Sequence, residues 1–452
     1  MPHDVSHFTV LLPVVIAGQS VSALFPAQTG CAMAHCDPMM SDNANTAAPL
    51  TQVHAYWHDT TVTGSNIGLG CSSNSSIAVC TLLPNSTATT TLKAYTASGS
   101  SPWSSTLLNN TAPYSAPMVN ADGSVIAADS EKVFRLNPDG SPAWITNTPG
   151  GIPISPTTTG DNSIILATLG GPVSAYDANT GVMLASLAIN ASINDNGVVK
   201  TGIFDTANTP TIQGNRIYIS TQFHETATGA ILPYGRLYAL DLMRTGETAQ
   251  LSIAWFYEFQ APSGASPLLI QTDNGTTIYF DGNGVIPGGS VDPHTFAVVD
   301  KGDHGELVWS YQMPTRALAG AARDPRGGLW IFVPQEPYLI RLDQTTGTEL
   351  QQLDVGALIN ESVVYWPSSA MSISGTATQP VMIVSTRTAT ATSSYLIAID
   401  LSAGTLLWKF RYDEGKGFDG HSYGQFPIVT SATGQPVVVF TTSDNGTWAF
   451  GQ

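Results

Sequence analysis

Short apolar segments separated by polar turns recur along most of the chain, and this pattern predicts strands joined by hairpins. In residues 398–408, AIDLSAGTLLW, an apolar strand ends at Asp400, a turn ends at Gly404, and the next strand carries Trp408. Glycine adopts the positive φ that tight hairpins need, and an Asp side chain accepts hydrogen bonds from the turn. The segment therefore predicts a β-hairpin with a tryptophan on its second strand.

The same sequence motif occurs seven times, and two of the copies lack the Asp. The hairpin is therefore a repeating unit. Its turn glycines are Gly99, Gly140, Gly181, Gly246, Gly305, Gly347 and Gly404. They lie about 41 to 65 residues apart, and a period of ~40–50 residues with four short strands predicts the blades of a β-propeller. The longer intervals are read as loop insertions. One irregular β-sandwich, the alternative, does not explain seven copies of one phrase.

The C-terminal residues 446–452, GTWAFGQ, resemble the strand before the turn, with Gly451 at the Asp position. A strand with a tryptophan, residues 53–57, precedes the first complete copy. We expect this strand to be the outermost strand of the last blade. The sequence thus predicts an all-β, eight-bladed β-propeller, closed by an N-terminal strand that completes the last blade and removes exposed strand edges.

The spacing of Asp400, Gly404 and Trp408 resembles the tryptophan-docking repeat of the PQQ-like family, the quinoprotein alcohol dehydrogenase-like β-propellers. The resemblance covers residues 51–452 and implies the fold. The family includes dehydrogenases that use pyrroloquinoline quinone (PQQ) with calcium, and non-enzymatic propellers that scaffold outer-membrane assembly. Fold alone does not decide between these roles.

The family's dehydrogenases hold the quinone between a tryptophan and a disulfide of two adjacent cysteines, and this chain has no adjacent cysteine pair. Their calcium lies among Glu, Asn and Asp side chains. Asn360, Glu361 and Asp419 are candidates for such ligands if they face the central funnel. The alternative is that they are solvated loop residues. No residue is assigned as catalytic.

Charge and the N-terminal pattern indicate an extracytoplasmic protein, periplasmic or secreted. Only 11% of residues are charged, and the net charge of −17 argues against nucleic acid and anionic membranes. Residues 1–25 resemble a secretory signal, with an apolar strand of the mature protein as the alternative. Residues 26–50 form an extension rich in Cys, His and Met, and residues 51–452 form the propeller. No apolar run reaches the ~18 residues of a transmembrane segment.

Four cysteines form two local pairs near the N-terminus, Cys31 with Cys36 and Cys71 with Cys80. An even number of cysteines in an exported protein predicts disulfides. We therefore expect disulfides 31–36 and 71–80.

A metal or haem centre competes with the first disulfide. Cys31, His35, Cys36 and either Met39 or Met40 are soft ligands for copper or haem iron. The disulfide and the metal centre exclude each other, because Cys31 and Cys36 cannot be both oxidised to a disulfide and present as thiolate ligands. Because residues 29–43 precede the closing strand, we expect them on the outer rim of the propeller.

His54 and His58 provide further imidazole ligands if residues four apart on a strand face the same side. The alternative is a pair of polar surface residues. In residues 280–294, Asp281, Asn283 and Asp292 are candidates for calcium ligands, although a long loop insertion explains them equally. The chain lacks the His-Glu-x-x-His zinc motif and the phosphate-binding Gly-Lys-Ser/Thr loop.

Three functions remain open. The first is an exported binding or assembly module that recognises a protein partner or itself. The second is an electron-transfer protein with haem or copper on the N-terminal segment. The third is a PQQ- and calcium-dependent dehydrogenase. The missing pair of adjacent cysteines favours the first over the third.

Overall fold

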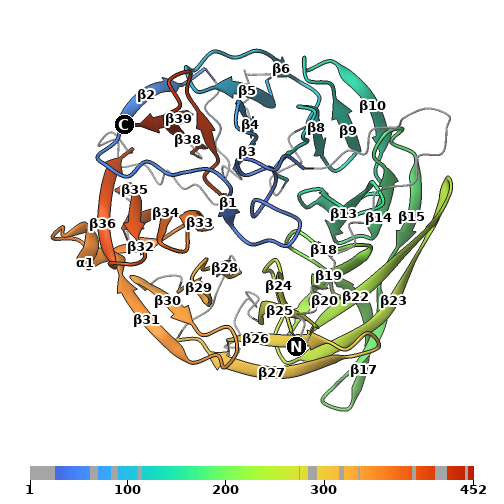
Figure 1. Ribbon diagram of the computed structural model, residues 1–452. Coiled ribbons are helices and arrows are strands. Elements are labelled where there is room, and N and C mark those ends of the chain that lie inside the picture. Colours follow the sequence, from blue (N-terminus) through green and yellow to red (C-terminus); the bar gives the residue numbers. More distant parts are fainter. Residues whose placement is uncertain are drawn as a thin grey trace, which may run out of the picture.

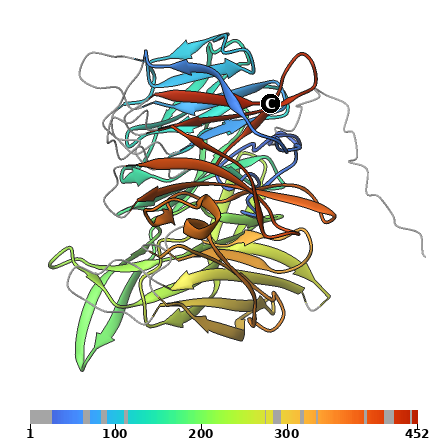
Figure 2. The ribbon, with the colours of Figure 1, turned by 90° about the vertical axis from the view of Figure 1, so that its left-hand side faces the viewer.

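The structure is a computed structural model that describes most of the chain. The described residues are 26–61, 70–82, 90–109, 115–273, 275–282, 293–314, 320–333, 336–388, 393–412, 425–442 and 446–452. Within them the structure has 39 strands and one five-residue helix, α1 (Val355–Ile359). The all-β prediction is confirmed. The sheets are arranged around a central axis, which Figure 1 shows along its length and Figure 2 from the side.

Four of the sheets come from residues 71–259. The first contains β3 (Cys71–Ser73), β4 (Ile77–Thr81), β5 (Leu92–Thr96) and β6 (Ser104–Ser105). The next contains β7 (Met118–Val119), β8 (Val125–Ala128), β9 (Lys132–Leu136) and β10 (Pro142–Asn147). The third contains β11 (Ile152–Pro153), β12 (Thr157–Thr158), β13 (Ser163–Leu169), β14 (Val173–Asp177) and β15 (Met183–Leu187). The fourth contains β18 (Thr211–Gln213), β19 (Arg216–Ser220), β22 (Gly235–Thr245) and β23 (Thr248–Phe259).

Four further sheets follow. One contains β24 (Leu268–Thr272), β25 (Gly275–Gly282), β26 (His294–Asp300) and β27 (Gly305–Gln312). The next contains β28 (Ala322–Arg323), β29 (Leu329–Phe332), β30 (Tyr338–Leu342) and β31 (Glu349–Asp354). Another contains β1 (Asn43–Ala44), β32 (Tyr365–Pro367), β33 (Ser372–Thr376), β34 (Gln379–Thr388), β35 (Ser394–Asp400) and β36 (Thr405–Arg411). The last contains β2 (His54–Asp59), β37 (Ile428–Thr430), β38 (Pro436–Thr441) and β39 (Thr447–Gly451).

A ninth sheet, which we call the insert sheet, lies between the third and fourth sheets in the sequence and is interleaved with the fourth. It contains β16 (Asn190–Asp195), β17 (Val198–Asp205), β20 (Gln222–Glu225) and β21 (Ile231–Leu232). Its β16–β17 hairpin projects away from the other sheets (Figures 1 and 2). The long interval between Gly181 and Gly246 therefore holds a folded element.

The N-terminal strand β2 pairs antiparallel with the C-terminal strand β39. His54 lies opposite Gly451, and Asp59 lies opposite Thr447. A bulge between Ala55 and Trp57 shifts the register by one residue. The sheet that contains the end of the chain is therefore completed by a strand from near its beginning.

The repeated hairpins have the turn chemistry that the sequence predicts. Six of the seven turn glycines have positive φ, but Gly305 does not, and the positive φ in that hairpin belongs to Gly302. The carboxylate of Asp400 accepts hydrogen bonds from the backbone N–H of Ser402 and Ala403, and Asp177 and Asp343 cap their own turns in the same way. One glycine was thus assigned to the wrong turn position.

Outer tryptophans such as Trp144 and Trp309 pack on the glycine turn of the neighbouring sheet, whereas Trp408 Nε1 donates a hydrogen bond to the carbonyl of Pro49. Trp144 Nε1 donates a hydrogen bond to the carbonyl of Ala178, and a Cβ atom on Gly181 would lie 2.4 Å from its ring. Trp309 Nε1 likewise donates a hydrogen bond to the carbonyl of Gln344, and a Cβ atom on Gly347 would lie 2.6 Å from the ring of Trp309. These contacts join consecutive sheets. The turn residue under the indole ring is glycine because a side chain at that position would collide with the ring.

Among the described residues, no helix is long and apolar enough to cross a membrane.

Candidate functional site

Residues 30–45, which we call the hub loop, lie at the centre of the ring of sheets. Gly30 and Asn45 at its two ends are bridged to each other, and β1 within it pairs parallel with β33. Figure 1 shows this blue segment at the centre of the ring of sheets. The expectation that residues 29–43 lie on the outer rim is wrong. The reason is that the segment is an inserted loop bonded to inner strands, and does not simply lead into β2.

Carbonyl groups of the hub loop accept hydrogen bonds from the backbone of six sheets. The donors lie on the inner strands β3, β7, β18, β24, β28 and β33, and the N–O distances are between 2.6 and 3.0 Å. The pairs, donor first, are Ser73–Cys31, Val119–Ala32, Ile212–Pro38, Leu269–Met39, Arg323–Ser41 and Ile373–Asp42. The loop therefore meets these sheets in the order in which they occur in the chain.

Gln425 adds a side-chain contact from the segment before β37. Its Nε2 donates to the carbonyl oxygens of Met33 and Cys71, at 2.9 and 3.2 Å. Because Gln425 is buried, these bonds satisfy polar groups that water does not reach.

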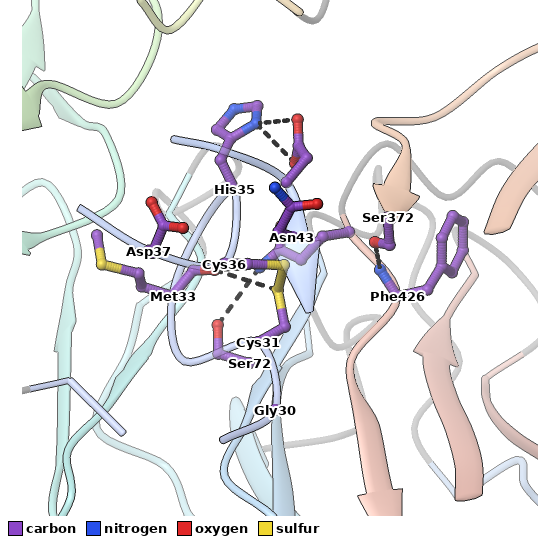
Figure 3. Close-up of a disulfide and its surroundings, with 12 residues drawn as sticks. Gly30, Cys31, Met33, His35, Cys36, Asp37, Asn43, Ser72, Ser372 and Phe426 are labelled. Carbon is purple, nitrogen blue, oxygen red and sulfur yellow. Dashed lines mark hydrogen bonds and ion pairs between the residues drawn. A yellow bond between two sulfur atoms is a disulfide. The ribbon is translucent and has the colours of Figure 1, made fainter. Parts of the chain in front are cut away.

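Both predicted disulfides, Cys31–Cys36 and Cys71–Cys80, are confirmed. The first closes the tight part of the hub loop and is buried (Figure 3). The second joins directly opposed residues of β3 and β4. In the disulfide state Cys31 and Cys36 have no thiolate to offer a metal.

The hub loop holds four non-glycine residues at positive φ, namely His35, Cys36, Met40 and Asp42. Such a conformation costs about 1–2 kcal/mol per residue, so it persists only where other contacts fix it. The disulfide and the bonds to the inner strands provide those contacts.

His35 and Asp42 form a buried pair within the loop. His35 Nδ1 lies 3.1 Å from both carboxylate oxygens of Asp42, and both residues are almost fully buried (Figure 3). Burial disfavours the charged imidazolium, but Asp42, with help from Asn208 and Asp37, outweighs burial and raises the pKa of His35. The pair ties the first turn of the loop to the last.

Asp37 holds a second turn of the loop. Its Oδ1 accepts hydrogen bonds from the backbone N–H of Met39, at 2.8 Å, and of Ser41, at 3.3 Å, while its Oδ2 accepts the hydroxyl of Ser41. Burial raises the pKa of Asp37, and these hydrogen bonds oppose that effect. Sequence reasoning missed Asp37 and Asp42. The only signal for Asp37 was an Asp four residues before a Ser, as in a side-chain-capped turn.

The residues predicted to bind metal are not brought together. His35 pairs with Asp42, Met40 packs in an apolar cluster with Met33, and Met39 packs against another cluster. Within the described part of the chain, no group of three or more His, Cys, Asp or Glu residues is placed to hold a metal. Binding of haem or copper by this segment stays a prediction.

His54 and His58 lie on β2, at the periphery of the ring and away from the hub loop (Figure 1). Their partners on β39, Gly451 and Trp448, are three residues apart, so the bulge turns the two histidines to opposite faces of the sheet. His58 stacks on Trp448, with 3.5 Å between ring centroids. The expectation that the pair faces one side is wrong.

The calcium candidates are scattered. Asn360 ends α1 in a left-handed conformation, and the carboxylate of Glu361 accepts hydrogen bonds from Tyr395 and from Lys409 on the outermost strand β36. Glu361 therefore does not face the centre, and the interpretation as a loop residue is favoured. Asp281 is buried, with its Oδ1 bonded to the hydroxyl of Thr295. Asn283, Asp292, Asp419 and residues 1–25 lie outside the described residues.

A cavity of about 450 Å³ opens between the hub loop and the strands β12 and β18. Its lining includes Asp37, Pro38 and Met39 from the hub loop, with Thr158 and Ile212 from the two sheets. Cavities of roughly 300–1,000 Å³ hold small ligands. This cavity is a candidate site for a small molecule among the described residues.

A family profile described as outer membrane protein assembly factor BamB matches residues 54–279, which is half of the chain. The chain belongs to this family. The match confirms the resemblance to PQQ-like repeat proteins. No curated protein matches the chain.

Solved structures show the same kind of fold. Quinohemoprotein alcohol dehydrogenase from Comamonas testosteroni is 12% identical, with a TM-score of 0.61 over 94% of this chain and 80% of that chain. The computationally designed Ika8 protein is 12% identical, with a TM-score of 0.54 over 89% and 99%. The C-terminal WD40 domain of Sif2 is 10% identical, with a TM-score of 0.53 over 90% and 99%. At these identities the similarity concerns the fold alone.

Proposed function

We propose that the protein is an exported binding or assembly propeller that performs no chemistry. In this proposal eight of the nine sheets are blades of one ring, β2 closes the ring, and the insert sheet is an addition to it. Residues 1–25 are a signal-like segment, residues 26–50 are an extension that enters the ring, and residues 51–452 form the propeller. The protein works outside the cytoplasm, in the periplasm or after secretion.

One observation carries the proposal, and it is that the hub loop occupies the centre of the ring. Its carbonyl groups bond to the inner strands of six sheets. A planar cofactor at this position would have to displace buried backbone that is already hydrogen-bonded, and an unpaired buried group costs roughly 1–3 kcal/mol. The faces and the rim remain for recognition, and these are surfaces that suit a macromolecule.

The partner in this proposal is a protein, either a different one or a second copy of the chain. Membership of a family described as an outer membrane protein assembly factor supports a protein partner. The net charge of −17 disfavours nucleic acid and anionic membranes, because both are polyanions. The insert-sheet hairpin is a candidate contact, because Val199 near its tip is 69% exposed.

No specific observation favours the two alternatives. A dehydrogenase of the resembled kind would need a stacking platform for its quinone, and Cys31 and Cys36, although bonded to each other, are five positions apart. An electron-transfer centre on the same segment would lose its two thiolate ligands to this disulfide, which leaves imidazole and thioether groups.

Two measurements on the full chain test the proposal. A photo-crosslinking residue at Val199, introduced in the producing cells, should give one defined protein adduct, while the same residue at the buried Val439 should give none. The purified protein should reduce no dye with alcohols or sugars after addition of PQQ and calcium. Cofactor-dependent dye reduction, or a visible absorption band with stoichiometric copper or haem iron, would replace the proposal with an alternative.

A further inference from the structure

The cavity beside the hub loop has a chemical character that the binding role does not explain. Its charged residue is Asp37, and none of the described residues that line it is Lys, Arg or His. In the described part of the chain Asp37 forms no ion pair, and its hydrogen bonds come from Met39 and Ser41. The nearest imidazole along the chain, that of His35, is paired with Asp42. Within the described lining, the Asp37 carboxylate thus faces no cationic side chain.

The polar lining beside Asp37 supplies several acceptor oxygens, and some of its donor groups already make hydrogen bonds within the protein. Gln28 Nε2 donates to the carbonyl of Pro26, and Asn45 Nδ2 donates to the carbonyl of Gln28. The hydroxyl of Thr158 donates to the carbonyl of Ser163. Amide and hydroxyl oxygens remain to accept hydrogen bonds from a ligand.

The rest of the lining is apolar and comes from two directions. Pro38 and Met39 contribute from the hub loop, and Ile212 contributes from β18. A ligand that fits must therefore combine several N–H donors and a positive charge with a short apolar body.

We propose that this cavity binds a small organic ammonium ion, whose N–H groups donate to Asp37 and the adjacent amide and hydroxyl oxygens while its apolar part packs on Pro38, Met39 and Ile212. An organic anion is disfavoured, because it would face Asp37 without a cation. A divalent metal is disfavoured as well, because calcium prefers several carboxylates and the lining supplies one. This inference goes beyond the proposed function and does not depend on it.

Isothermal titration calorimetry on the full chain tests the inference with n-butylammonium chloride, sodium butyrate and calcium chloride as probes. We expect n-butylammonium to bind at one saturable site, and butyrate and calcium to give no saturable heat at the same concentrations. Equal binding of butyrate, tighter binding of calcium, or no saturable binding of n-butylammonium would overturn the proposal.

Asp37→Asn removes the charge while its side-chain oxygen can still accept from Met39 and Ser41. It should weaken n-butylammonium binding at least about tenfold, because a hydrogen bond to a charged group is lost. Asp139→Asn is the matched control. Asp139 is an exposed turn residue that also accepts from a backbone N–H and a hydroxyl, both of Ser141, and it is not in the lining.

Gly160→Leu is a second variant in case Asp37→Asn fails to fold. Gly160 lines the cavity, has no positive φ, and a Cβ on it would meet no atom closer than 3.7 Å. The added side chain should weaken binding by a similar factor while thermal unfolding stays unchanged. Unchanged affinity in both folded variants would place the ammonium ion elsewhere and end the proposal.

Discussion

The indole Nε1 of Trp57 donates a hydrogen bond to the carbonyl of Ala97, with 3.0 Å between nitrogen and oxygen. The ring stacks on Tyr95 and covers Gly99, where a Cβ atom would lie 2.7 Å from Trp57 Cγ. Trp57 belongs to the sheet that holds the end of the chain, and Gly99 belongs to the first complete hairpin. One tryptophan therefore joins the last sheet to the first.

Replacing Trp57 with alanine should lower the free energy of unfolding by about 3 kcal/mol, since the stacked ring and its hydrogen bond are lost. Urea denaturation measures the effect. His54→Ala, an exposed position on the same strand, should change stability by no more than about 0.5 kcal/mol. If the two variants are equally stable, the contact between the last and first sheets contributes nothing.

Gly99→Ala should destabilise the protein more than Gly170→Ala. Both glycines have positive φ, but a Cβ on Gly170 meets no atom within 4 Å. Gly170→Ala therefore pays only the backbone penalty of about 1–2 kcal/mol, whereas Gly99→Ala also collides with Trp57.

A double-mutant cycle isolates this collision. In the Trp57→Ala background, Gly99→Ala should have the same effect as Gly170→Ala has in the natural protein. If Gly99→Ala has the same effect in both backgrounds, the ring does not determine the choice of glycine there.

Removing the disulfide of the hub loop by Cys31→Ala with Cys36→Ala should lower the free energy of unfolding by about 2–3 kcal/mol, the range expected for a short closed loop. We expect a larger loss than for Cys71→Ala with Cys80→Ala, because the latter pair also lies on strands held by their own ladder. Chemical denaturation of both double variants measures the difference. A hub-loop variant as stable as the natural protein would show that the inner-strand bonds alone fix the loop.

Asp281 should give stability a defined pH dependence. Burial raises its pKa to about 6, while the hydrogen bond from Thr295 opposes the rise. The folded state therefore holds this proton more tightly than the unfolded chain does. The contribution of Asp281 to stability is fully present below its unfolded pKa of ~4 and is lost as pH rises through about 6.

Asp281→Asn should remove this dependence. The difference in free energy of unfolding between variant and natural protein should shift by about 2–3 kcal/mol in favour of the variant between pH 4 and 8. Urea titrations at several pH values measure it, with the exposed Asp139→Asn as the control. A difference that stays constant with pH would mean that Asp281 titrates normally.

The repeated hairpins were predictable because their information is local. A turn Asp, a glycine and a tryptophan lie within about ten residues, and each has one physical reason to be there. The same locality explains why both disulfides were predicted. One local detail was nevertheless predicted wrongly, because Gly302 and not Gly305 has the positive φ in its hairpin.

The hub loop was not predictable for the opposite reason. Its position depends on bonds to Ser73 and, at the other extreme, Ile373, and no local pattern encodes partners so distant in sequence. The prediction that His54 and His58 face the same side of β2 was wrong, because a single bulged residue reverses which face the following side chains point to. The charge of Asp37 was visible in the sequence, but its burial beside a cavity was not.

The hub loop also has a consequence for the order in which the molecule is built. During synthesis its residues emerge early, whereas the inner strand that carries Ile373 emerges some 330 residues later. The loop cannot reach its final hydrogen bonds until those strands exist, and contacts between such distant residues form slowly. The hub loop is therefore synthesised early but is among the last parts of the described chain to reach its final position.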